Sequence, residues 1–122
     1  MEWGRNAASG AVATPRRRYG TYSILLALLA PTLVILAGSY LVSLPSDAPE
    51  AAETVATTLT LVAYGLVAPV LHLVGMGFAV AGLRSVNAGK VSSVIGLLLN
   101  IAMVAAGVFF GWIAASGIGA FT

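Results

Sequence analysis

The sequence predicts an all-α integral membrane protein with three transmembrane helices. Of its 122 residues, 59% are hydrophobic and only 8% are charged, whereas soluble domains carry about 25% charged residues. The apolar residues gather in three long runs, at about residues 22–44, 54–83 and 91–118. Each run is long enough to cross a hydrocarbon layer about 30 Å thick. We therefore expect the bilayer to be the solvent for most of the chain.

The chain divides into a tail and a membrane domain. Residues 1–20 form a cytoplasmic basic tail rich in glycine, alanine and serine, a composition that provides no core of its own. Residues 21–122 form the three-helix transmembrane domain. The tail ends close to Arg16, Arg17 and Arg18, which are expected at the membrane surface.

The first span and the loop after it carry features that shape helices. Pro31 lies inside the span, removes a backbone donor and is expected to bend the helix. The following loop is acidic, and Asp47 and Glu50 have the spacing of a capping box. We expect the second helix to begin near Ala48, before its apolar run begins.

The second and third spans are predicted to form an antiparallel hairpin. Pro69 interrupts the second span near its middle. The loop of residues 84–90 is short and contains Asn87 and Gly89, which tolerate the backbone conformations of turns. So short a connection leaves the two helices side by side and opposite in direction.

The distribution of charge predicts the orientation. All six basic residues lie in the tail or around the loop between the second and third spans, and three of the four acidic residues lie between the first and second. Cytoplasmic loops carry the excess of Lys and Arg, so we expect a cytoplasmic N-terminus and a periplasmic or extracellular C-terminus. The expected location is the cytoplasmic (inner) membrane of a bacterium. The basic residues are Arg5, Arg16, Arg17, Arg18, Arg84 and Lys90.

The composition argues against an enzyme. The chain has no cysteine, one histidine and four acidic residues. Disulfides, thiolate nucleophiles and Fe–S ligation are thereby excluded, and too few ligands remain for a dedicated metal site. A hydrolase needs a nucleophile beside a base, and the spans offer only His72 as a base. We predict no catalytic residue and no metal site.

The basic cluster of Arg16, Arg17 and Arg18 predicts a surface for lipid or for a partner. Such a cluster attracts anionic headgroups by about 1 kcal/mol per residue. Three arginines at a bilayer surface form no element that reads a nucleic-acid groove. The expected partners are therefore other integral membrane subunits and anionic lipids, and no nucleic acid.

Small residues recur on two of the predicted helices and indicate close helix packing. On the third helix they repeat every four residues, a spacing that lets another helix approach. On the second helix they lie within helical steps of His72. The predicted packing residues are Gly75, Ala79, Gly96, Asn100, Gly107, Gly111 and Ala115.

His72 and Asn100 are polar side chains expected well inside the membrane. Each lies fourteen residues from Val86, at the centre of the hairpin loop, so we expect them to approach at matching depth, directly or through one water. The alternative is that His72 is the axial ligand of a haem iron or a chlorophyll magnesium. We expect packing rather than ligation, because a single histidine cannot ligate both faces of a haem.

Residues 75–113 resemble short bacterial membrane proteins of unknown function that have several spans. In these proteins an apolar helix ends in Gly-Leu, a short basic turn follows, and a glycine-rich helix carries Gly-Leu-x-Leu-Asn. The motifs here read Ala81-Gly-Leu-Arg84, Asn87-Ala-Gly-Lys90 and Gly96-Leu-Leu-Leu-Asn100. The resemblance implies a structural role for Asn100 and brings no activity with it.

The sequence leaves three functional hypotheses open. The first, favoured by the small size and the small-residue faces, is an accessory or structural subunit of a larger membrane complex, of the kind found in respiratory and photosynthetic assemblies. The second is an electron-transfer or light-harvesting subunit that carries haem or chlorophyll at His72. The third is a self-associating channel or transporter component, which is weakened by the lack of paired intramembrane charges.

Overall fold

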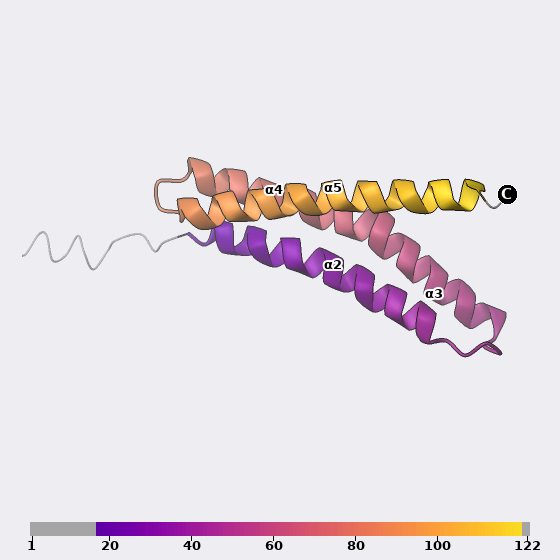
Figure 1. Cartoon of the computed structure of the whole chain (residues 1–122). Helices are drawn as coiled ribbons and strands as arrows, with labels where there is room; N and C mark the ends of the chain where they lie inside the picture. Colours follow the sequence, from indigo (N-terminus) through magenta and orange to yellow (C-terminus); the bar gives the residue numbers. More distant parts are fainter. Residues whose placement is uncertain (1–16, 121–122) are drawn as a thin grey trace, which may run out of the picture.

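The structure, a computed structural model, describes residues 17–120 and consists there of three long helices joined by two turns (Figure 1). Each is long and apolar enough to cross a membrane, so the predicted all-helical class with three candidate spans is confirmed. Arg5 and Arg16 lie outside the described residues. The elements in order are α2 (Tyr19–Ser43), α3 (Glu50–Val62), the π-helical turn η1 (Ala63–Val67), α4 (Ala68–Arg84) and α5 (Lys90–Ala120).

The helix that begins at α3 starts two residues later than expected, and its predicted capping box is absent. Pro49, with φ −59° and ψ 142°, occupies the N-cap position, and no side chain caps the helix. The Pro49 carbonyl accepts the N–H groups of Ala52 and Glu53 at 2.8 and 3.2 Å. Because the fixed φ of proline suits the residue at which the chain enters a helix, Asp47 is left outside it.

Pro69 does not break the second helix but widens it. Segments α3, η1 and α4 form one continuous helix from Glu50 to Arg84, 35 residues long. Proline has no N–H and its ring clashes with the carbonyl four residues earlier. The π-helical turn relieves this conflict, since the N–H of Ala68 reaches back five residues to Ala63. Pro31 likewise lies within an unbroken α2.

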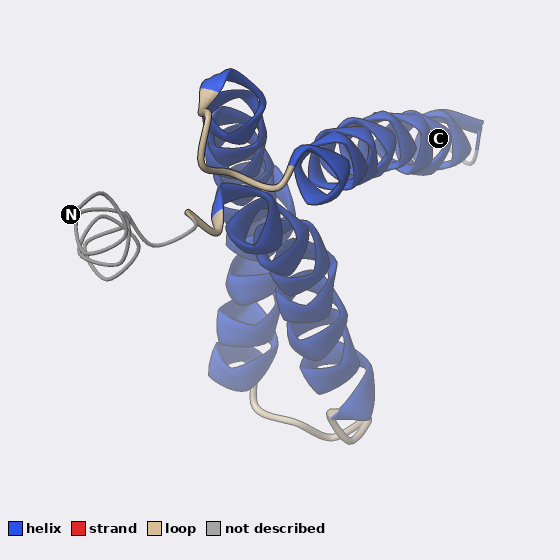
Figure 2. Cartoon of the chain, turned by 90° about the vertical axis from the view of Figure 1, so that its left-hand side faces the viewer, coloured by secondary structure: helices blue, strands red, loops and turns tan. Residues whose placement is uncertain are grey.

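The three helices pack closely near the turn of residues 85–89, and towards the opposite end α5 alone separates from the other two, which stay together. Helix α2 packs against both α4 and α5, and α4 packs against α5. Figures 1 and 2 show α5 diverging from α2 and α3 as it approaches the C-terminus. The molecule is therefore closed at one end and open at the other.

The core of the closed end contains only small and polar side chains. Its buried positions recur at alternating steps of three and four residues on each helix, the repeat of coiled-coil packing, but without large apolar groups. Small residues allow helix backbones to approach closely. The positions are Gly20, Ser23, Ala27 and Ala30 on α2; Ala68, His72, Gly75, Ala79 and Gly82 on α4; and Ser93, Gly96 and Asn100 on α5.

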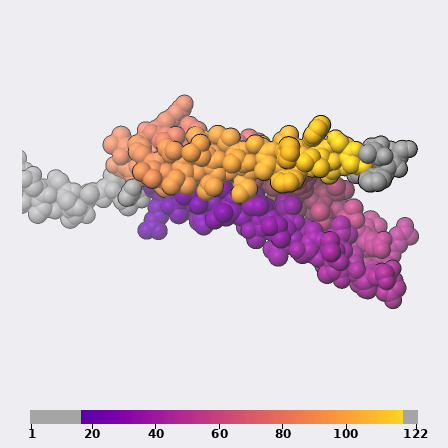
Figure 3. Space-filling view, in the orientation of Figure 1, coloured from indigo at the N-terminus to yellow at the C-terminus, as the bar shows by residue number. Residues whose placement is uncertain are grey.

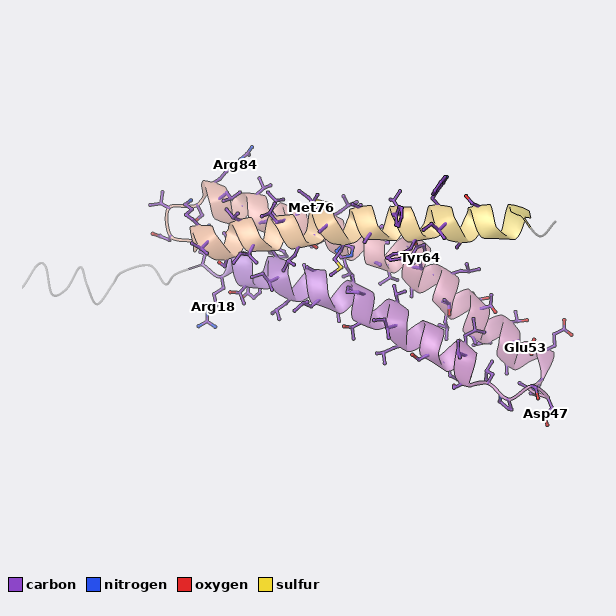
Figure 4. All side chains as sticks on the ribbon, in the orientation of Figure 1. Arg18, Asp47, Glu53, Tyr64, Met76 and Arg84 are labelled. Carbon is purple, nitrogen blue, oxygen red and sulfur yellow. The ribbon has the colours of Figure 1, made fainter. Side chains whose placement is uncertain are left out.

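Charged residues lie at the two ends of the bundle. Figure 4 shows Arg18 and Arg84 at the closed end and Asp47 and Glu53 at the far end. At the closed end Lys90 Nζ donates to the carbonyl oxygens of Gly82 and Ser85 at 3.3 and 2.6 Å. A cation at this position complements the negative end of the α4 dipole.

We predict that Gly75→Ala destabilises the fold whereas Gly77→Ala does not. A Cβ at position 75 would lie 2.7 Å from the Asn100 side-chain nitrogen and oxygen, while at position 77 it would meet nothing within 4 Å. Overpacking of this kind costs about 1–3 kcal/mol. The free energy of unfolding, measured by SDS titration of the protein in detergent micelles, checks the pair. Equal stability of the two variants would contradict the close packing of Gly75 against Asn100.

Candidate functional site

His72 and Asn100 meet across the closed end of the bundle, as the sequence predicts. His72 Nδ1 lies 2.9 Å from Asn100 Oδ1. The two side chains are 5% and 0% exposed. Gly75 makes room for the amide, because any Cβ there would collide with it. The contact therefore depends on a packing glycine that the sequence also singles out.

A third helix joins this contact through Ser23, which the sequence analysis did not identify. Asn100 Nδ2 donates to the Ser23 carbonyl at 3.0 Å, lies 3.1 Å from Ser23 Oγ, and donates to the Gly96 carbonyl at 2.8 Å. Gly96 in turn admits Ser23, since a Cβ at 96 would lie 2.4 Å from the hydroxyl oxygen. One amide thus joins α2, α4 and α5. The only sequence feature that marks Ser23 is its spacing from Gly20, Ala27 and Ala30.

The hydrogen bonds fix the tautomer of His72. The group of Asn100 that faces two backbone carbonyls must be its NH₂, because carbonyl oxygens only accept. The oxygen of the amide therefore faces His72, and Nδ1 must carry the hydrogen that it accepts. In the neutral imidazole the other nitrogen, Nε2, is then an acceptor with a free lone pair.

An apolar cavity of about 650 Å³ lies beside this network, where the helices begin to separate. Figure 3 shows α5 running along one edge of the molecule, with α2 and α3 sloping away from its line. All three long helices line the cavity, and nearly all of the lining is apolar. Its walls include Pro31, Val34, Gly65, Ala68, Met103 and Gly107, with His72 among them.

Tyr64 closes one side of the cavity and accounts for part of the predicted ridge on α5. From η1, its hydroxyl donates to the Gly107 carbonyl. A Cβ at Gly111 would lie 2.6 Å from the same hydroxyl oxygen. Gly111 therefore faces Tyr64 of the same chain, Gly107 bonds it through its carbonyl only, and Ala115 is exposed. The sequence analysis did not identify this role for Tyr64.

The described part of the basic cluster lies at the closed end. Arg17 and Arg18 are exposed. The Arg17 backbone N–H donates to the Asn87 carbonyl at 2.9 Å, and its guanidinium donates to the Tyr19 hydroxyl at 3.0 Å. The end of the tail is thus fastened to the α4–α5 turn, and the two side chains remain available to headgroups or a partner.

The donor set at the cavity fits a haem poorly. His72 is the single nitrogen ligand in the lining, and no lining residue is cationic, so nothing there would pair with haem propionates. Among residues 17–120 no three His, Cys, Asp or Glu side chains are grouped to hold a metal ion. A macrocycle without free carboxylates needs only one axial nitrogen, which Nε2 can supply.

Comparison of the chain with protein families, curated proteins and solved structures finds no match. The geometry of the site consists of a polar network that fixes one imidazole and an apolar cavity beside that imidazole.

We predict that Asn100→Leu destabilises the protein more when His72 is present than when it is replaced. The single variant leaves the buried Nδ1–H without an acceptor, at about 1–3 kcal/mol, whereas Asn100→Leu with His72→Leu removes both partners. The double variant should therefore lose less than the sum of the two single losses. The free energy of unfolding in detergent micelles is measured for the four proteins of this double-mutant cycle: the wild type, the two single variants and the double variant. Additive losses would show that the contact contributes nothing.

Proposed function

We propose that this chain is a small structural subunit that packs within a larger membrane complex. The proposed hosts are respiratory and photosynthetic assemblies. The observation that supports it most is the position of Ala115. The small-residue face of α5 is covered by α2 and α4 as far as Asn100 and by Tyr64 at Gly111, but it continues uncovered to Ala115. Small residues in register favour close helix contact in a bilayer.

The shape of the molecule supports the same proposal. Helix α5 extends beyond its contacts with α2 and α4 and exposes Phe109, Phe110 and Trp112, with exposed fractions of 55%, 63% and 67%. An isolated bundle would leave this helix end against lipid alone. A neighbouring subunit that occupies the space between α5 and α3 would bury the small residues of this helix end.

A second candidate function is a light-harvesting or electron-transfer subunit with a chlorophyll-type macrocycle at His72. The observation that favours it is the hydrogen bond of Nδ1 to Asn100, since metal-bound histidines usually donate their other nitrogen in this way. The visible absorption spectrum of the protein purified from native membranes tests it. A visible absorption band that is present in the native protein and lost in His72→Leu would support this candidate. A native protein without visible absorption would rule it out.

We predict that a photoactivatable probe at Ala115 crosslinks to another membrane subunit. The chain has no cysteine, so Ala115→Cys can be labelled alone with a benzophenone maleimide. Ala102→Cys is the matched control, because Ala102 is also an exposed alanine of α5 but lies about three and a half turns closer to the α4–α5 turn. Irradiation in native membranes and mass spectrometry should give a protein adduct from position 115. Adducts with lipid alone from both positions would count against the subunit.

The proposed membrane orientation is that the basic end lies in the cytoplasm. The described basic residues Arg17, Arg18, Arg84 and Lys90 gather at one end of the bundle, and cytoplasmic segments carry such an excess. Reporter fusions after Asn87 and after Thr122 should therefore report the cytoplasm and the opposite side, respectively. A cytoplasmic signal from the Thr122 fusion would contradict the proposed orientation.

A further inference from the structure

We propose that the cavity beside His72 binds an amphiphile of the membrane interior that carries a hydroxyl donor on an apolar body. The hydroxyl donates to His72 Nε2, and the apolar body fills the space between α2, η1–α4 and α5. A site of this kind goes beyond the structural role proposed above. It does not depend on the identity of a host complex.

The first step is that Nε2 is an acceptor without a partner. Nδ1 carries the hydrogen that Asn100 Oδ1 accepts at 2.9 Å, so Nε2 carries the lone pair. Among residues 17–120 no group bonds to Nε2, yet no described side-chain nitrogen or oxygen is both fully enclosed and unpaired. Nε2 is therefore accessible, and because His72 lines the cavity, its access is from there.

The second step is that lipid tails and water do not satisfy this nitrogen. Acyl chains match the apolar walls but offer no donor, and a polar group left unpaired in an apolar medium is unfavourable. A water molecule needs two to four polar partners to be held in a cavity. The lining offers His72 and Tyr64 as its polar side chains, and they lie about two helical turns apart along the helix. A ligand that joins a donor to an apolar body satisfies both parts of the site.

The third step distinguishes a hydroxyl from a metal macrocycle. An axial histidine must present its nitrogen to the face of a broad flat ring, so removing the ring exposes much of the imidazole edge. His72 is only 5% exposed. So small an exposed area suits a single hydroxyl group rather than the face of a ring. The packing of α2 and α5 around His72 thus selects a small donor at the end of a larger apolar body.

The probe is a hydroquinone with a short prenyl chain, tested against its own dimethyl ether. The two have the same apolar body, but only the hydroquinone donates a hydrogen bond. We expect the hydroquinone to bind the full chain in lipid nanodiscs about tenfold more tightly than the ether, the effect of one good hydrogen bond. Titration calorimetry measures both. Equal affinities, or binding by neither, would overturn the proposal.

Two substitutions and one control substitution locate the binding site. Gly107 lines the cavity, and a Cβ there meets nothing within 4 Å, so Gly107→Leu should fill the space and abolish binding with the fold intact. Gly77→Leu is the matched control, because Gly77 also has open space around its Cβ but lies outside the lining. In His72→Phe the tenfold preference for the hydroquinone should disappear. Binding unchanged in Gly107→Leu would overturn the site.

A spectroscopic measurement on the unaltered chain does not depend on how the variants fold. With ¹⁵N-labelled histidine, the ring should show one protonated nitrogen, Nδ1, and one unprotonated nitrogen, Nε2. Hydroquinone should shift the Nε2 resonance, and the ether should not. If the Nε2 resonance does not shift with hydroquinone but does shift with a zinc porphyrin ester, the proposal is wrong and the ligand is a macrocycle.

Discussion

The side-chain amide of Asn100 is the group on which the closed end of the molecule depends. Its NH₂ group bonds carbonyl oxygens of α2 and of its own helix, and its oxygen accepts from His72 on α4. A buried polar group is costly unless it is fully bonded, so this amide permits only an arrangement in which all three helices are present. The small side chains around it follow from the same requirement, because the backbones of α2 and α5 must approach closely enough for the bonds to form.

The open end follows from a different constraint. Pro69 cannot continue an α-helix without a lost hydrogen bond, and the turn η1 accommodates it by widening the backbone. Tyr64 lies in that turn and holds α5 through the Gly107 carbonyl. Beyond Gly111, which faces the same hydroxyl, α5 diverges from α2 and α3 (Figures 1 and 2). The cavity is lined both by His72, which bonds the Asn100 amide, and by Tyr64, which bonds α5.

The two proposals concern different parts of this arrangement. The exposed end of α5, with Ala115, offers a surface to another helix, whereas the cavity at His72 offers a single acceptor in apolar surroundings. The polar network contributes to ligand binding in the cavity because it fixes the His72 ring and its tautomer, so that the lone pair of Nε2 is already oriented towards a ligand's hydroxyl. A structural subunit that also binds a membrane-soluble molecule beside its neighbour would use both the exposed end of α5 and the cavity.

The sequence by itself determined the three long apolar helices, the separation of basic and acidic residues, and the matching depth of His72 and Asn100, because hydropathy, charge and distance from a short loop are local properties of the chain. Only the tertiary structure decided that Ser23 is the third partner, that His72 lines a cavity, that Gly111 faces Tyr64 and that Ala115 is exposed. It also replaced the expected cap of Asp47 by Pro49. These outcomes depend on how each helix is rotated and crossed against the others, and a pattern of small residues allows many such rotations until one set of polar atoms is fully bonded.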